Sequence, residues 1–186
     1  MRGTSHVVIG VTLTGAMMIQ TGHTFGMASA AVAGLGSLLP DIDEDSSTIN
    51  KYIPMSCNKL IYAALGGYLI YQVYKTKNYA LLMPAILSLL IYISGHRGFT
   101  HSLLSMAIFT AAAITTPSYI YPFAIGYGLH LICDMLNDKG ITLLYPIKKK
   151  IRLPLHFPMT SLTGMALEYG MVVISAYLYI HNIGVI

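Results

Sequence analysis

The sequence predicts an all-α fold, a polytopic membrane helix bundle of six to seven short spans in a single domain, 1–186. Hydrophobic residues make up 55% of the chain and charged residues only 10%. The mean hydropathy of +0.64 is higher than a water-soluble domain of this size needs for its core. Apolar runs of helical length recur along the chain, and polar segments separate them. No internal repeat or low-complexity tract divides the sequence.

Each predicted helix is an apolar run bounded by a polar or helix-breaking turn, such as 21–24, 75–78 and 116–118. A helix needs about 20 residues to cross a bilayer core, and fewer where the membrane thins, so several of these runs are short. Pro40 ends the second run, and Thr100 can cap the fifth. In chain order the predicted helices are 6–20, 25–39, 60–74, 79–94, 101–115, 119–136 and 164–181.

The first run loosely imitates a secretory signal peptide, with Arg2, an apolar stretch and the small residues 28–30. The polar break at 20–24 leaves those small residues too far from the apolar stretch for cleavage. We therefore expect the first helix, which contains His6, to be retained.

The basic residues indicate which way the bundle faces. Counting crossings from the N-terminus returns the chain to its starting side after the second, fourth and sixth helices. Only Lys75 and Lys77 fall on the other side. Because cytoplasmic loops carry the excess of basic residues, we expect a multi-pass protein of the cell inner membrane with its starting side in the cytoplasm. The starting side holds nine basic residues, Arg2, Lys51, Lys59, Arg97, Lys139, Lys148, Lys149, Lys150 and Arg152.

The formal net charge of +4 does not indicate nucleic-acid binding. The basic residues lie in loops between apolar runs, without the aromatic interleaving that such binding needs. The segment 137–163 contains three consecutive lysines, and it either lies along anionic headgroups or acts as a simple topology anchor. The two cysteines are far apart and offer neither a disulfide framework nor a CxxC metal site. The expected partner is the bilayer, with no nucleic acid.

Histidines and aspartates gather in local groups at the predicted cytoplasmic end. His130 and Asp134 are four residues apart, so a helix places both side chains on one face. In residues 40–43, Pro-Asp-Ile-Asp, the proline is expected to leave an extended chain from which Asp41 and Asp43 project the same way. Each group also has a purely structural explanation. His130 and Asp134 could be a hydrogen-bonded structural pair, and the two aspartates could lie in a solvated loop. Together they indicate ligands for divalent ions.

A third group is the string His-Arg-Gly-Phe-Thr-His at residues 96–101. A turn at Gly98 lets the rings of His96 and His101 converge, with His101 in the first turn of the next helix. The amides of that turn and the Arg97 guanidinium favour an anion, phosphate above all. Two histidines around an arginine indicate a functional site more strongly than one histidine does.

Other ionisable residues are assigned by their side of the membrane. His6 starts the first helix on the cytoplasmic side, and Glu168 enters the last helix there, where the cost of burying a carboxylate indicates a ligand or general base. His156 lies on the same side in a proline-broken loop. His23 and His181 lie on the opposite side and are expected to be turn or interface residues.

The motifs resemble a known family, the LexA-binding, inner-membrane-associated hydrolases of bacteria and archaea, also described as membrane-bound metal-dependent hydrolases. The His-Arg-Gly-x-Thr-His-Ser string is the most specific part of a resemblance that covers most of the chain. More remotely, the order of the motifs is similar to the metal core of zinc-dependent phospholipase C and P1 nuclease. This chain has no clear His-x-x-x-Glu, which that core also uses. The motifs are His6, Leu39-Pro40-Asp41-Ile42-Asp43, residues 96–102, residues 130–134, Gly140 and Leu144-Tyr145-Pro146.

These residues predict an integral membrane metal-dependent hydrolase that cleaves a phosphoester of a phospholipid or other lipid phosphate with a metal-activated water. Mixed histidine and carboxylate ligands suit one or two ions of Zn²⁺, with Mn²⁺ or Fe²⁺ as substitutes. Arg97 is expected to hold the developing charge, and Asp43 or Glu168 to accept a proton. The expected metal ligands are His6, Asp41, Asp43, His96, His101, His130 and Asp134.

Two other functions stay open from the sequence. One is a metal-ion or proton-coupled membrane transporter, and the other is a membrane scaffold with a structural metal. Transport sites tend to lie near the bilayer midplane at broken helices, whereas these ligands collect at helix ends, which favours an enzyme. The sequence lacks the G-x-S-x-G and H-E-x-x-H patterns of other hydrolases.

Overall fold

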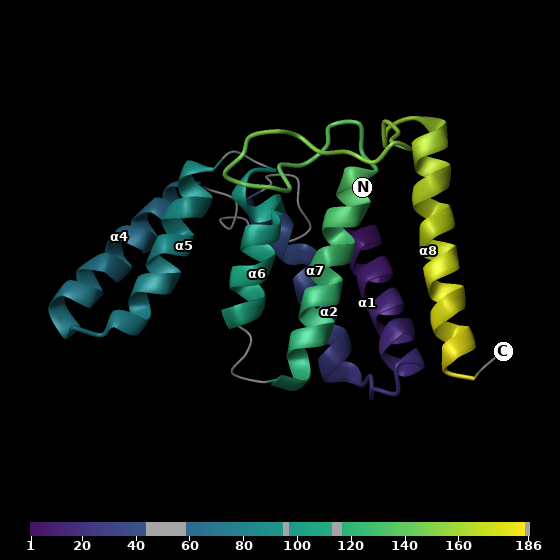
Figure 1. Ribbon diagram of the computed structural model, residues 1–186, viewed down its shortest axis with the longest axis horizontal. Coiled ribbons are helices and arrows are strands. Elements are labelled where there is room, and N and C mark those ends of the chain that lie inside the picture. The colour runs from purple at the N-terminus through teal and green to yellow at the C-terminus, as the bar shows by residue number, and fades with distance from the viewer. Residues whose placement is uncertain (44–58, 95–96, 113–116, 185–186) are drawn as a thin grey trace.

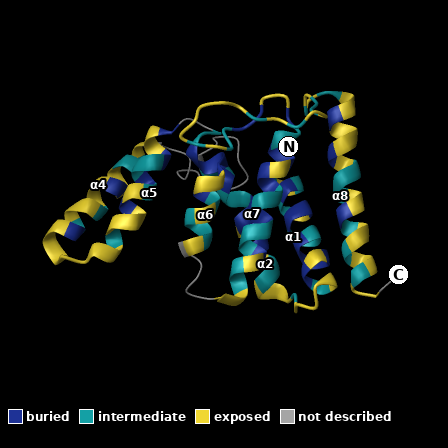
Figure 2. Ribbon diagram, in the orientation of Figure 1, coloured by how far each residue is buried: buried dark blue, intermediate teal, exposed yellow. Residues whose placement is uncertain are grey.

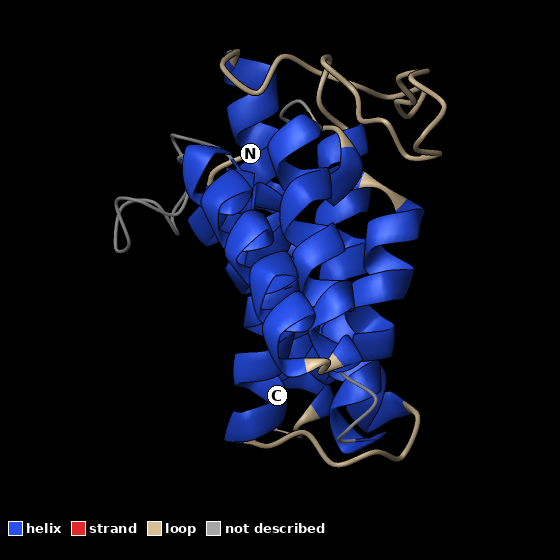
Figure 3. Ribbon diagram, turned by 90° about the vertical axis from the view of Figure 1, so that its left-hand side faces the viewer, coloured by secondary structure: helices blue, strands red, loops and turns tan. Residues whose placement is uncertain are grey.

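The computed structural model describes residues 1–43, 59–94, 97–112 and 117–184. In these residues, seven α-helices stand side by side and no β-strand forms (Figure 1, Figure 3). Each predicted apolar run forms one of them, which confirms the all-α prediction. The helices are α1 (Gly3–Gln20), α2 (Met27–Leu38), α4 (Lys59–Thr76), α5 (Leu82–Ile93), α6 (Leu103–Ala112), α7 (Ile120–Met135) and α8 (Leu162–Asn182).

Helices α1, α2 and α7 pack against one another, and α8 covers α1. Glycines allow the closest approach. A Cβ atom on Gly126 would lie 2.3 Å from the carbonyl oxygen of Ala33, and one on Gly36 would lie 2.5 Å from the carbonyl oxygen of Phe123. Helices α2 and α7 therefore meet backbone to backbone, as small residues allow in membrane bundles.

Helices α4 and α5 form a hairpin that leans away from the other helices (Figure 1). At its base, Tyr62 and Ile91 are buried together with Phe99, which belongs to the short 3-10 helix η3 (Phe99–His101). This contact attaches the hairpin to the end of the bundle that holds the predicted site.

Many large apolar side chains are exposed on the helices, for example Val173 and Ile174 of α8, which are 66% and 60% exposed. Exposed positions recur along the outer helices (Figure 2). Among the described residues, α8 is the one helix with both the length and the composition to cross a membrane, while 27–42 and 79–93 are shorter apolar helices. The number of crossings stays a prediction.

The structure corrects two local predictions. Residues 40–43 are not extended, because they continue α2 as the 3-10 helix η1 (Leu39–Asp43). Pro40 lies at the beginning of this short helix, where a missing N–H is tolerated. Helix α6 begins after Ser102, whose Oγ accepts a hydrogen bond from the Ser105 amide at 3.1 Å, so Ser102 and not Thr100 is its cap.

The chain between α7 and α8, residues 136–161, crosses the end of the bundle near the N-terminus (Figure 1). This α7–α8 loop is folded. The amide and carbonyl groups of Ile141 and Ile151 bond to each other at 3.0 and 2.8 Å, and the Phe157 amide donates to the Leu136 carbonyl at 2.9 Å. The loop lies on the same end as η1 and η3.

Candidate metal centre

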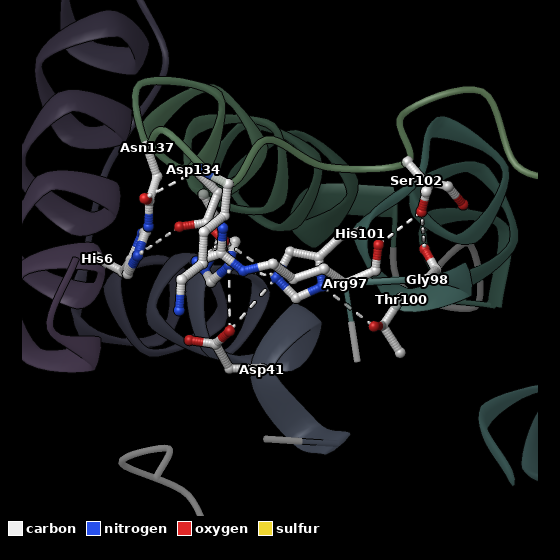
Figure 4. A network of polar contacts seen from close by, with 12 residues as sticks. His6, Asp41, Arg97, Gly98, Thr100, His101, Ser102, Asp134 and Asn137 are labelled. Carbon is white, nitrogen blue, oxygen red and sulfur yellow. Dashed lines mark hydrogen bonds and ion pairs between the residues drawn. The ribbon is translucent and has the colours of Figure 1, made fainter. Parts of the chain in front are cut away.

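Four ligand side chains converge where η1, η3 and α7 meet (Figure 4). Asp41 comes from η1, His101 from η3, and His130 and Asp134 from successive turns of α7. One ligand atom from each of them lies within 4.8 Å of all the others. All four belong to the ligands expected from the sequence, and the fold brings the pair on α7 together with Asp41 and His101.

Five of the six distances between the four ligand atoms can be compared with coordination of one ion, and the sixth, between the two carboxylate oxygens, is at most 4.8 Å. His101 Nε2 lies 3.4 Å from Asp41 Oδ1 and 3.3 Å from Asp134 Oδ2. His130 Nε2 lies 3.6 Å and 4.0 Å from the same oxygens and 3.4 Å from His101 Nε2. Tetrahedral ligands with bonds near 2.0–2.2 Å are about 3.3–3.6 Å apart. Four of the five distances fit this edge length, and the fifth needs a small adjustment.

Second partners orient both imidazoles. His130 Nδ1 lies 2.7 Å from the Ser37 carbonyl oxygen, which only accepts, so Nδ1 carries the proton and Nε2 presents a lone pair. His101 Nδ1 lies 3.2 Å from Thr100 Oγ1. Both Nε2 atoms face the two carboxylates, and the carbonyl partner fixes the tautomer of His130, as second partners do for metal-binding histidines.

The site is buried and contains two carboxylates. His101, His130 and Asp134 are at most 2% exposed, while the Asp41 side chain is 16% exposed. Burial opposes ionisation of Asp41, but the hydrogen bond with His101 and the surrounding imidazoles hold its pKa well below the usual value. Burial also opposes a charged His101, yet Asp134 and Asp41 outweigh it and raise the pKa of His101 to about 9.

Arg97 and His6 contact Asp134 from two sides. Arg97 Nη2 lies 3.3 Å from Asp134 Oδ2, and His6 Nε2 lies 3.4 Å from Asp134 Oδ1. The His6 ring also stacks on the His130 ring with centroids 4.0 Å apart. The Arg97 Nη1 atom is buried and has no hydrogen-bond partner among the described residues.

The backbone of Arg97 has a left-handed conformation, with φ of +60°, which is uncommon for residues other than glycine. The α7–α8 loop holds this turn. Thr142 Oγ1 donates to the Arg97 carbonyl oxygen at 2.6 Å and lies 2.9 Å from that of Gly98. A strained turn fixed from another element is typical of functional sites.

The structure brings together most of the predicted site residues, but Glu168 has other partners. Its carboxylate accepts hydrogen bonds from the Arg2 amide at 3.0 Å and from the Ser5 hydroxyl. It therefore connects α8 to the first turn of α1, next to His6. The side chain of Asp43 and all of His96 lie outside the described residues. The residues that do meet are His6, Asp41, Arg97, His101, His130 and Asp134.

The remaining histidines lie where their sequence positions place them. His156 Nδ1 donates to the Leu153 carbonyl oxygen within the α7–α8 loop. His23 stacks near Tyr121 at the opposite end of the bundle. Sequence reasoning missed Ser37, which acts through a backbone carbonyl that no side-chain pattern reveals. It also missed Thr142, although the motif residues around it indicated the segment.

Comparison with known proteins identifies the family. The family described as YdjM inner membrane protein matches residues 1–184. The chain belongs to this family. Its relative YvsG of Bacillus subtilis (strain 168) is 28% identical over 182 residues, which cover 96% of this chain and 94% of YvsG. Inner membrane protein YdjM of Escherichia coli (strain K12) is 38% identical over 72 residues, 34% of this chain and 37% of that protein. No solved structure matches this chain.

Membership of the YdjM family confirms the predicted membrane-bound family and supports the inner membrane as the location. Hydrolase activity and the likeness to zinc-dependent phospholipase C and P1 nuclease stay predictions. The four-residue cluster supports the predicted metal site in its coarse form, a group that can hold a metal ion.

Proposed function

We propose that this YdjM-family protein is a polytopic membrane hydrolase that uses a divalent metal ion, Zn²⁺ or in its place Mn²⁺ or Fe²⁺, to cleave a phosphoester of a phospholipid or other lipid phosphate. The observation that carries the proposal is the convergence of four ligand atoms beside a buried guanidinium nitrogen without a partner. Two imidazoles and two carboxylates form a donor set that suits these metals better than Mg²⁺.

The exposure of the side chains indicates where a substrate enters. The side chains of Asp41 and Arg97 are 16% and 15% exposed, while those of His101, His130 and Asp134 are at most 3% exposed. A phosphoryl group that approaches from the open side meets the exposed part of the Arg97 side chain. Donation from the buried Nη1 requires a small movement of this side chain, and the contact of Nη2 with Asp134 can persist.

A bound divalent ion supplies Lewis acidity, which lowers the pKa of a water and polarises the phosphoryl oxygen. Arg97 binds the charge that develops on the phosphoryl group. Asp43 is one of the two proposed proton acceptors, and its backbone lies in η1, two residues from Asp41. The Glu168 carboxylate already accepts hydrogen bonds from the Arg2 amide and the Ser5 hydroxyl at the start of α1.

Two features support a lipid substrate, and a third indicates which side the site faces. Large apolar side chains cover the outer faces of the bundle, as expected for a protein surrounded by lipid. The metal centre lies at one end of the helices, where a lipid headgroup would reach it with the acyl chains still in the bilayer. The same end carries the basic α7–α8 loop, so it is proposed to face the cytoplasm.

The alternative functions are a metal-ion or proton-coupled transporter and a scaffold with a structural metal. The near-complete burial of three ligands favours the scaffold, because structural sites are closed. The partial exposure of the Asp41 and Arg97 side chains favours the enzyme, because a substrate needs access to the metal centre. Metal analysis and a hydrolysis assay separate these functions.

The experiment compares purified wild-type protein with His101→Ala and Asp134→Ala. Each variant removes a buried ligand, so we expect the bound metal to fall from about one ion per chain to a small fraction. Asp138→Ala and His156→Ala are matched controls, since Asp138 is exposed and His156 bonds within the loop. Full metal content in both ligand variants would exclude this site.

Hydrolysis is tested with the metal-loaded wild-type protein on a panel of lipid phosphates and phospholipids in mixed micelles. We expect release of a phosphate-containing or lipid product that requires the metal. Metal binding without turnover of any member of the panel would contradict the enzyme and leave the carrier or scaffold.

A further inference from the structure

The α7–α8 loop combines charge and exposed apolar side chains in a way that the metal site does not explain. Residues 136–161 contain five basic residues and one acidic residue, Asp138, and so have a net charge of +4, equal to that of the whole chain. The side chains of Lys148, Lys149, Lys150 and Arg152 are exposed, and no ion pair involves them among the described residues. The loop is thus a concentrated positive surface.

Large apolar side chains flank these basic residues. Ile147 is 60% exposed, Leu155 is 72% exposed and Leu144 is 48% exposed. They belong to the loop between α7 and α8 and not to the helices themselves. Much of this loop is exposed where it crosses the end of the bundle (Figure 2). Exposed apolar side chains beside lysines are the composition of segments that bind at a lipid interface.

The loop presents these residues from a defined structure. Ile141 and Ile151 form an isolated antiparallel bridge through two backbone hydrogen bonds. This bridge joins the segments that come before and after the lysines. The Leu153 amide donates to the Met135 carbonyl oxygen at 2.8 Å, which ties the loop to the end of α7. Ile147 and the lysines therefore lie in a segment that the bridge between Ile141 and Ile151 closes into a loop.

We propose that the α7–α8 loop is a docking surface for anionic lipid headgroups. Ile147 and Leu155 enter the interface, and Lys148, Lys149, Lys150 and Arg152 bind the headgroup phosphates. The inference rests on the proposed membrane embedding of the bundle, and it is independent of hydrolysis. Phosphate binding by basic residues explains the charge, and insertion explains the apolar exposure.

The loop is also bonded to the turn that carries Arg97. Thr142, in the same loop, bonds to the carbonyl oxygens of Arg97 and Gly98, and the Leu103 amide donates to the Leu143 carbonyl oxygen at 2.9 Å. The proposed docking surface and the Arg97 turn therefore lie at the same end of the bundle.

The chain contains no tryptophan, so a single introduced tryptophan reports its own surroundings. The full-length variants Ile147→Trp and Leu155→Trp are reconstituted in phosphatidylcholine vesicles with and without phosphatidylglycerol, the acyl chains being brominated. We expect brominated lipid to quench both reporters, and more strongly when phosphatidylglycerol is present. Replacing Lys148, Lys149 and Lys150 with glutamine in the Ile147→Trp protein should abolish the added quenching.

Leu178→Trp in α8 is the control for membrane embedding. Absence of quenching at this position would contradict embedding itself, which belongs to the proposed function. Quenching of Leu178→Trp without quenching of the loop reporters would overturn the docking proposal and indicate a protein partner for the loop. Equal quenching of the loop reporters in neutral and anionic vesicles would overturn it as well.

Discussion

At the residue scale, Asp134 is the side chain on which the site converges. Its Oδ1 atom faces His6, and its Oδ2 atom faces His101, His130 and Arg97. A carboxylate that is 2% exposed needs such partners, because an unpaired buried charge is costly. The positive charges and the metal ligands are therefore organised around a single helical residue.

Arg97→Lys tests the role of the guanidinium. Lysine keeps the charge but lacks the planar guanidinium fork, whose two separated nitrogens can face Asp134 and the substrate in fixed directions. We expect the metal content to be unchanged and the rate of lipid phosphate hydrolysis to fall by about 10²-fold, the typical effect of losing one donor to the developing charge. Steady-state kinetics of the metal-loaded variant measure this effect. Arg152→Lys, in the exposed loop, is the matched control, and a wild-type rate for Arg97→Lys would contradict substrate contact.

Glu168→Gln distinguishes a proton acceptor from a residue that positions α1. The amide oxygen of glutamine can still accept from the Arg2 amide and the Ser5 hydroxyl, whereas it cannot act as a base. We expect near wild-type hydrolysis and metal content in this variant. Glu168→Ala leaves the donors unpaired and should cost about 1–3 kcal/mol in the free energy of unfolding. Loss of turnover in Glu168→Gln, with metal content preserved, would instead identify Glu168 as the base.

At the scale of elements, the metal centre depends on how closely α2 and α7 approach. Helix α2 continues into η1, which carries Asp41, and α7 carries His130 and Asp134. Ser37, in α2, accepts the His130 Nδ1 hydrogen through its carbonyl oxygen. A change in the separation of these two helices must therefore move ligands apart.

Gly126→Ala probes this contact. The new Cβ atom would lie 2.3 Å from the Ala33 carbonyl oxygen, so the helices have to separate. We expect a loss of about 1–3 kcal/mol in the free energy of unfolding, together with weaker metal binding. Thermal unfolding in detergent and metal titration measure the two effects. Gly170→Ala in α8 is the control, since its Cβ meets nothing within 4 Å, and equal behaviour of the two variants would contradict the role of the α2–α7 contact.

The elements also show how far the sequence could predict the site. Helical spacing alone predicts that His130 and Asp134 share a face, and apolar runs predict the seven helices. The contact of His6 with Asp134 joins residues that are far apart in the chain, so only the packing of α1 on α7 reveals it. The 3-10 conformation of η1 was not predicted, because a proline after an apolar run fits either a helix end or the start of a new turn.

At the scale of the whole molecule, the proposed orientation depends on an odd number of crossings between Lys75 and Lys149. Helices α5, α6 and α7 lie between them. Helix α6 decides the count, because its 10 residues extend about 15 Å and a bilayer core is about 30 Å thick. If α6 crosses with local thinning of the membrane, the two lysines face opposite sides.

Cysteine labelling in a background with Cys57→Ser and Cys133→Ala tests this orientation, with the exposed Lys75→Cys and Lys149→Cys as reporters. We expect an impermeant maleimide to label Lys75→Cys in intact cells and Lys149→Cys only in inverted membrane vesicles, because basic loops stay in the cytoplasm. Labelling of both from one side would require an even number of crossings. It would place the metal centre and the α4–α5 turn on the same side of the membrane. The basic loops would then no longer support a cytoplasmic site.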